Sequence, residues 1–160
     1  MNSRLSQDEG RQAFEKSLHY LKFRPRSSQE IKRHLRGKGF SDAAVSEALN
    51  LLEYYSYVND EEFARIWIES RSRNRPRGRF ALGYELMQKG VAEEIIEGML
   101  AGFDEEKPAW RAVEPKLEQW AGLDPPLLRK KIHQHLKRRG FAYDTCEKTF
   151  QKAVSWLGDG

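Results

Sequence analysis

The chain carries an internal repeat with a period of about fifty residues, anchored by the glycines Gly39, Gly90 and Gly140. Apolar residues recur at fixed distances from each glycine: eight and four residues before it, and one, six and ten residues after it. A proline also precedes each glycine by fourteen residues. The repeat therefore predicts one structural unit built three times. Its apolar frame comprises Ile31, Leu35, Phe40, Val45 and Leu49, then Leu82, Leu86, Val91, Ile96 and Leu100, then Ile132, Leu136, Phe141, Cys146 and Phe150.

The spacing within each block predicts two helices joined at the glycine. Apolar residues four apart lie on one face of a helix, and they occur on both sides of the glycine. Glycine suits this corner because a helix often ends with a residue of positive φ. A further apolar helix precedes each pair, so we expect three helices per repeat and about nine in all. Helix starts are indicated by Ser27 with Glu30, by Ser41, by Asn59 with Glu62, and by Asp124 before Pro125.

The expected fold is all-α: three tandem three-helix repeats stacked into an elongated, curved body, because a single unit has little core of its own. We place the repeats at residues 13–57, 58–103 and 104–157, between an N-terminal extension, 1–12, and a C-terminal tail, 158–160. Residues 54–58 form a weak strand candidate, which we interpret as a helix end and a turn. The first helix of the third repeat is expected to carry Val113, Leu117 and Trp120.

Composition bounds the function classes. The chain has 160 residues, 39% of them apolar, which leaves a modest core and does not favour a large globular enzyme. Cys146 is its one cysteine, so no disulfide forms within the chain and a reducing compartment is indicated. Residues 1–10 lack the apolar core of a signal peptide, and no run of about 18 apolar residues occurs. We expect a soluble cytoplasmic protein.

Charge is distributed in blocks, although the net charge is only +4. Basic segments lead into each glycine, and acidic segments follow the first two. Any single Lys or Arg is readily explained as a solvated surface residue. Five arginines within residues 71–79 would repel one another, so a phosphate backbone or an acidic protein face is the expected partner. The binding candidates are Arg24, Arg26, Lys32, Arg33, Arg36, Lys38, Arg71, Arg73, Arg75, Arg77, Arg79, Arg129, Lys130, Lys131, Lys137, Arg138 and Arg139.

No constellation predicts catalysis, a cofactor or a metal. His133 and His135 are two residues apart on a helix and cannot share a metal. Cys146 occupies an apolar frame position, so packing explains it better than nucleophilic chemistry. The acidic run 60–62 fits a helix start.

Two further modes of nucleic-acid binding have weaker support in the sequence. A helix-turn-helix that reads bases is disfavoured because the helices after Gly39 and Gly90 are acidic. Base stacking by the four tryptophans is less favoured than packing, because they alternate with aliphatic residues at helical spacing.

Several segments together resemble the RecX family of bacterial regulatory proteins. The similar segments are residues 24–30 (RPRSSQE), 35–40 (LRGKGF), 57–64 (YVNDEEFA), 75–78 (RPRG) with 85–91 (ELMQKGV), and 138–144 (RRGFAYD). They occur in family order across residues 13–155. The sequence departs from the pattern between Gly102 and Asp124, and at Ala142, where the family often has serine.

The resemblance implies a non-enzymatic regulator, with no catalytic residues and no cofactor. It implies binding to the RecA recombinase filament, with inhibition of recombinase, ATPase and coprotease activities, in recombination, DNA repair and the SOS response. It also implies weak, nonspecific binding of single- or double-stranded DNA by a monomer. The alternatives are a nonspecific nucleic-acid-binding protein that competes for DNA, and a purely structural helical adaptor.

Overall fold

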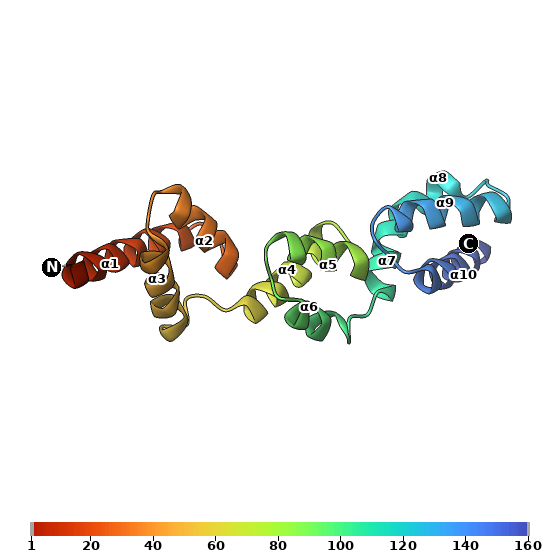
Figure 1. Cartoon of the computed structure of the whole chain (residues 1–160). Coiled ribbons are helices and arrows are strands. Elements are labelled where there is room, and N and C mark those ends of the chain that lie inside the picture. The colour runs from red at the N-terminus through yellow and green to blue at the C-terminus, as the bar shows by residue number, and fades with distance from the viewer. Residues whose placement is uncertain (1, 160) are drawn as a thin grey trace. The chain divides into compact units, whose positions relative to one another are not determined.

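The computed structural model describes residues 2–159, and the described chain is helical with no β-strand (Figure 1). This confirms the all-α prediction. The helices are α1 (Asn2–Leu21), α2 (Ser28–Gly37), α3 (Asp42–Tyr54), α4 (Asp60–Asn74), α5 (Arg79–Gln88), α6 (Glu93–Leu100), α7 (Glu106–Val113), α8 (Leu117–Trp120), α9 (Pro125–Lys137) and α10 (Tyr143–Gly158). No helix in the described range is long and apolar enough to cross a membrane.

The chain divides into two compact units. Unit 1 comprises the residues up to 65 together with 86–96, and unit 2 comprises 66–85 together with the residues from 97 onwards. The core of unit 1 lies among α1, α2 and α3, where Ile31, Leu35 and Leu52 are fully buried. The core of unit 2 lies among α7, α8, α9 and α10, around Ile132 and Leu136. Each core therefore uses the apolar frame that the repeat predicts.

The three glycine turns are confirmed. Gly39, Gly90 and Gly140 have φ of +90°, +76° and +82°, the region that favours glycine. In each turn the residue after the glycine donates its N–H to the carbonyl five residues earlier, as from Phe40 to Leu35 at 3.2 Å. This bond satisfies a carbonyl that the helix end would leave unpaired.

The predicted helix starts are also confirmed. Ser27 and Glu30 form a reciprocal capping box on α2, and the Ser41 side chain accepts the Ala44 N–H of α3. The Asn59 side chain caps α4, although the Glu62 carboxylate pairs with Arg65 instead of reaching back to the cap. Asp124 caps α9, which has proline at its first position.

The first helix of the third repeat is interrupted, which corrects the prediction of one continuous helix. The chain runs from α7 through a 3₁₀ turn, Glu114–Lys116, into the short α8. Pro115 explains the break because it has no N–H and its ring clashes with the carbonyl four residues earlier. Val113 and Leu117 are nevertheless fully buried, so both sides of the break face the core.

Two further segments clarify the expected boundaries. Residues 55–59 form a turn in which Ser56 has a φ of +60°, so the interpretation of 54–58 as a helix end and turn is correct. Helix α1 already begins at Asn2, so the segment assigned to an N-terminal extension continues the first helix within the described range. The repeat boundaries remain predictions.

Consecutive repeats meet in one recurring contact, in which a glycine turn lies against the start of the second helix of the preceding repeat. We call the contact of residues 89–90 with the start of α2 junction 1; it lies within unit 1. We call the contact of residues 139–140 with the start of α5 junction 2; it lies within unit 2. Several of the binding candidates lie on or beside these two junctions.

Candidate partner and nucleic-acid interface

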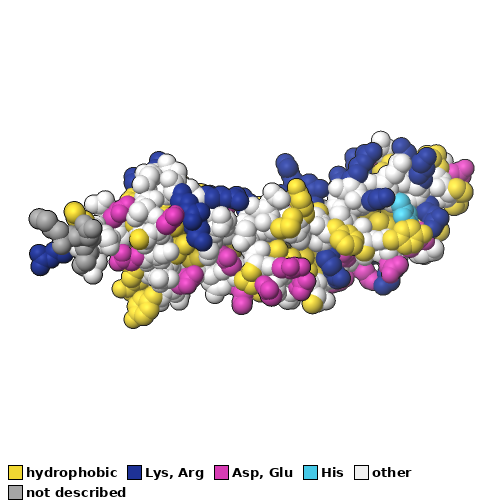
Figure 2. Space-filling model, in the orientation of Figure 1, with side chains coloured by type: hydrophobic (Ala, Val, Ile, Leu, Met, Phe, Trp, Pro, Cys, Tyr) yellow, Lys and Arg dark blue, Asp and Glu magenta, His cyan; other side chains and the backbone are white. Residues whose placement is uncertain are grey.

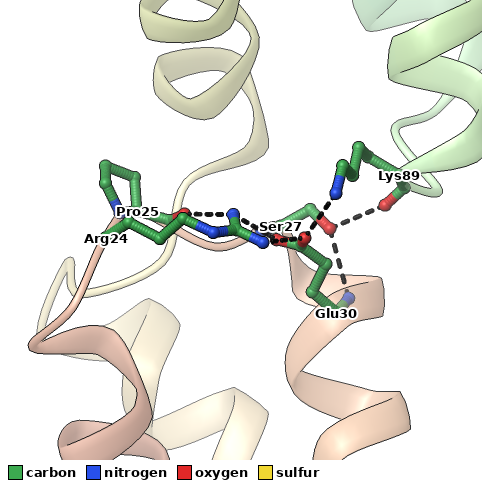
Figure 3. Close-up of polar contacts among 5 residues, drawn as sticks. All are labelled: Arg24, Pro25, Ser27, Glu30 and Lys89. Atoms are coloured by element: carbon green, nitrogen blue, oxygen red, sulfur yellow. Dashed lines mark hydrogen bonds and ion pairs between the residues drawn. The ribbon is translucent and has the colours of Figure 1, made fainter.

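Junction 1 is closed by the buried hydroxyl of Ser27 (Figure 3). The Ser27 Oγ donates to the Lys89 carbonyl oxygen at 2.6 Å and accepts the Glu30 N–H at 3.2 Å. In return the Glu30 carboxylate accepts the Ser27 N–H at 3.0 Å. One hydroxyl therefore caps α2 and fixes the turn of the next repeat against it.

Glu30 also binds two cations across this junction. Its Oε1 lies 2.7 Å from Arg24 Nη2 and 3.0 Å from Lys89 Nζ (Figure 3). Burial alone would raise the pKa of this carboxyl, but hydrogen bonds from Arg24, Lys89 and the Ser27 N–H outweigh it and lower the pKa. Glu30 in turn raises the pKa of the Arg24 guanidinium. Arg24 therefore has a structural contact within the chain, and its role as a binding residue stays a prediction.

A second acid caps α2 from the following repeat. Asp60, the first residue of α4, accepts the Ser28 N–H at 2.9 Å and lies 3.2 Å from the Ser28 hydroxyl. A carboxylate at a helix N-terminus satisfies unpaired N–H groups and interacts favourably with the helix dipole. This contact gives Asp60 a structural role, as its position at a helix start indicates.

Arg26 lies in a stack of three planar groups beside junction 1. Its guanidinium carbon is 3.8 Å from the centre of the Tyr20 ring, which stacks on His34 at 3.9 Å and 3°. The Nε of Arg26 is buried and makes no hydrogen bond within the described chain. Burial and the nearby charges of Lys38, Arg26 and Lys16 lower the pKa of His34. These residues form basic cluster 1: Lys16, Arg26, His34 and Lys38.

The remaining candidates of unit 1 are peripheral to this cluster. Arg36 is half exposed and pairs with the exposed Asp42 at 3.2 Å, a contact that contributes little. Arg33 is exposed and Lys32 half-buried, and neither has an ion pair in the described chain. Sequence reasoning missed Lys16 and His34 because their proximity to Arg26 arises only when α1 packs beside α2.

Junction 2 relies on backbone contact. The Gly78 N–H donates to the Arg139 carbonyl at 2.8 Å, and the Phe80 N–H donates to the Gly140 carbonyl at 3.1 Å. A Cβ on Gly78 would lie 2.4 Å from the Gly140 oxygen, so this close approach requires glycine.

One buried carboxylate completes junction 2. Glu105 is 6% exposed and accepts the Arg79 N–H at 3.1 Å and the Ala142 N–H at 3.0 Å. These groups lie at the starts of α5 and α10, so one side chain caps two helices. The methyl side chain of Ala142 cannot accept a hydrogen bond, so it cannot cap α10 itself. Sequence reasoning missed Glu105 because it lies in an acidic stretch of the kind that is usually exposed to solvent.

Three arginines converge at junction 2. Burial and the positive charges of Arg77 and Arg138 lower the pKa of Arg139. Arg139 donates to the His135 carbonyl at 2.9 Å, and the buried Nε of Arg77 has no hydrogen-bond partner among the described residues. No carboxylate pairs with any of the three within the described chain. We call Arg77, Arg138 and Arg139 basic cluster 2.

The run of arginines predicted to repel one another is divided by the fold. Arg71 lies 3.3 Å from Glu85 and over the Trp67 ring. Arg79 donates to the Phe103 carbonyl at 3.1 Å and lies 3.9 Å from Glu105. Both therefore have partners within the chain. Arg73 and Arg75 are exposed, with no ion pair in the described chain.

The basic residues of the third repeat lie on α9. Arg129 pairs with Glu147 at 2.6 Å, and His133 lies 2.6 Å from the same carboxylate. The three lysines of this helix are exposed: Lys130, Lys131 and Lys137. Figure 2 shows several Lys and Arg side chains gathered over α9.

The arrangement offers cations and aromatic rings without a chemical centre. Cys146 is buried, and burial with the nearby Glu105 raises the pKa of its thiol, which opposes thiolate chemistry. The described residues contain no group of three or more His, Cys, Asp or Glu able to hold a metal. Three tryptophans are partly buried, as predicted. Trp156 is 45% exposed, and its ring lies edge-to-face with that of Trp110, at 6.4 Å between the ring centres.

The chain matches known proteins along most of its length. Residues 13–52 match the first three-helix domain of RecX, and residues 59–100 match the second. Regulatory protein RecX of Prosthecochloris aestuarii is 36% identical over 151 residues, which cover 94% of this chain and 99% of that protein. The chain belongs to the RecX family.

Two further comparisons extend this assignment. Regulatory protein RecX of Bacillus licheniformis is 33% identical over 156 residues. These residues cover 96% of this chain but only 59% of that longer relative. The crystal structure of RecX from Lactobacillus salivarius superposes with a TM-score of 0.85 over 92% of this chain and 98% of that one. At 21% identity, that structure supports the fold alone. Both relatives are named as regulatory proteins.

Proposed function

We propose that this RecX-family protein binds RecA and its DNA filament and inhibits the recombinase, ATPase and coprotease activities of RecA. Basic cluster 2 is the observation that carries the proposal, because three converging arginines lack a carboxylate partner within the described chain. A phosphate or an acidic protein surface would relieve their mutual repulsion. The proposed setting is the cytoplasm, in recombination, DNA repair and the SOS response, with the protein acting as a monomer.

The binding surface in this proposal comprises the second helices and glycine turns of the repeats. Arg26 and Arg77 occupy equivalent positions, thirteen residues before the glycines of their repeats. In both, the buried Nε makes no hydrogen bond within the described chain, and the residue is only partly buried. A bound phosphate or carboxylate would accept charge-assisted hydrogen bonds from the accessible part of each guanidinium.

Tandem repeats suit a filament partner. Repeats place similar binding elements at several points along one chain, and these can contact more than one subunit of a polymer. In the proposed arrangement the protein lies in the helical groove of the RecA filament and bridges protomers. Crosslinks from both units that reach two RecA protomers would support bridging, and crosslinks confined to one protomer would contradict it.

The decisive experiment titrates the protein into RecA already bound to single-stranded DNA. ATP hydrolysis and co-sedimentation are followed at moderate and at high salt. The matched variant reverses the charges of Arg73, Arg75 and Arg77, which have no ion pair within the described chain. We expect substoichiometric, saturable inhibition by the wild-type protein, together with co-sedimentation that persists at high salt. The variant should require much higher concentrations for the same inhibition.

A nonspecific nucleic-acid-binding protein is the second candidate, favoured by the same arginines. Such a protein would affect RecA only by competing for DNA. Its binding would weaken steeply with salt, because neutralising phosphates releases counterions. An effect on RecA that begins only when the protein saturates the DNA would establish this candidate in place of the first.

A further inference from the structure

The exposed face of α5 differs in chemistry from the equivalent faces of α2 and α9. Phe80 and Tyr84 lie one helical turn apart and are 68% and 61% exposed. The equivalent residues are Gln29 and Arg33 in α2, and Lys130 and Gln134 in α9. Large rings bury much area when they find a partner, so an exposed pair on one helix face marks a contact surface. The second repeat thus has an aromatic pair where the other repeats are polar or basic.

The aromatic pair lies beside basic cluster 2. The Phe80 N–H is bonded to the carbonyl of Gly140, the residue that directly follows Arg139. Arg77 lies three residues before Phe80, and its charge acts on Arg139. Within unit 2, exposed rings and uncompensated arginines therefore occupy one surface.

Two carboxylates on or beside α5 are already engaged. Glu85 accepts the Trp67 indole N–H at 2.9 Å and pairs with Arg71 at 3.3 Å. Glu105 is buried beneath the start of α5, where it caps two helices. Neither carboxylate neutralises basic cluster 2, so the surface attracts an anion that also has flat apolar faces.

We propose that Phe80 and Tyr84 form a stacking platform for the unpaired bases of single-stranded nucleic acid, while basic cluster 2 binds its phosphates. This proposal rests on the proposed function and specifies its DNA contact. Every base presents a flat π face to an aromatic ring, whereas a duplex hides these faces between stacked pairs. The helix rises about 1.5 Å per residue, so the two rings are about 6 Å apart along α5 and can contact successive bases.

The test uses the full chain with both rings removed, Phe80→Ala with Tyr84→Ala. The probes are a fluorescent oligodeoxythymidine and a duplex of equal length, and binding is followed by fluorescence anisotropy across a salt series. The matched control is Phe23→Ala with Tyr54→Ala, which removes two rings that are 74% and 79% exposed in unit 1. Circular dichroism checks that both variants remain folded.

We expect the α5 variant to lose at least about tenfold in affinity for the single strand. Its affinity for the duplex should change by less than about twofold, and its salt dependence should remain that of the wild-type protein, because its arginines are intact. The control variant should bind both probes like the wild-type protein. Phe80→Trp should retain single-strand binding, because tryptophan also stacks on bases.

Unchanged single-strand affinity in the α5 variant would overturn the platform, and so would an equal loss for both probes. A loss of RecA binding measured without DNA, with unchanged single-strand affinity, would assign the surface to a protein partner instead. The anisotropy measurement does not involve RecA. A platform that fails while the wild-type protein inhibits RecA leaves the proposed function intact, and a wild-type protein without effect on RecA refutes that function alone.

Discussion

Junction 1 and junction 2 have the same geometry but different chemistry. At junction 1 Gly90 lies close to Gln29, and the polar contact is distributed over the side chains of Ser27, Glu30 and Asp60. At junction 2 the contact depends on close backbone approach at Gly78 and on the single carboxylate of Glu105. One repeat architecture can therefore be closed by a network of side chains or by a few demanding positions. The second solution should be the more sensitive to single substitutions.

The largest expected effect is that of Gly140→Ala. The new Cβ would lie 2.4 Å from the Ala81 nitrogen at a φ of +82°, so steric overlap adds to backbone strain. We expect the free energy of unfolding to fall by about 4 kcal/mol in urea denaturation. Gly39→Ala is the matched control, because its φ is also positive but no atom lies within 4 Å of the new Cβ. It should lose only about 1.5 kcal/mol, and equal losses would contradict the close approach at junction 2.

The next effect is that of Glu105→Ala. The change leaves the Arg79 and Ala142 N–H groups without their acceptor, so we expect a loss of about 3 kcal/mol in the free energy of unfolding. The control, Glu106→Ala, removes an exposed carboxylate that pairs with the exposed Lys148. Its loss should be a small fraction of the first. Similar losses for the two variants would show that Glu105 is not the central contact of junction 2.

A smaller effect is expected for Ser27→Ala at junction 1. The variant loses a helix cap and the bond to the Lys89 carbonyl, but Glu30 and Asp60 still hold the junction. We expect a loss of about 1.5 kcal/mol, measured by the same denaturation. Ser46→Ala, on the exposed face of α3, should have almost no effect. A loss for Ser27→Ala as large as that for Glu105→Ala would contradict the distributed character of junction 1.

The smallest effect is a pH dependence of stability at junction 1. The folded-state pKa of Glu30 is lowered, so its ion pairs contribute stability above the unfolded-state pKa of about 4.3. That contribution is lost as the pH falls from there through the folded-state pKa. We expect Glu30→Gln to be less stable than the wild-type protein at neutral pH, with the difference shrinking on acidification. A difference that stays constant across the titration would show that the charge of Glu30 contributes nothing.

Local signals allowed much of the fold to be predicted. The glycine turns, the caps at Ser27 and Asp124 and the apolar frame all arise from residues within one or two helical turns of each other. The break at Pro115 was also encoded locally, since a proline disfavours a helix interior, but the apolar spacing on both sides concealed it.

The candidate site was only partly predictable, because its decisive contacts are distant in sequence. Glu105 reaches N–H groups that are 26 and 37 residues away. Arg24 and Arg71 belong to basic segments, but the fold brings a carboxylate to each. The order of charged residues in the sequence indicated which segments are positively charged. Only the packing of α1 on α2, and of the third repeat against α5, shows which of those charges remain uncompensated.

Amide hydrogen exchange, with and without RecA bound to single-stranded DNA, tests the central claim most directly. In the proposed function the second helices and glycine turns bind the filament, while the acidic α3 and α6 do not. We predict slower exchange on binding in residues 24–39, 71–90 and 129–141, and little change in 42–54 and 93–100. Protection confined to α3 and α6, or no protection at a saturating filament concentration, would contradict it.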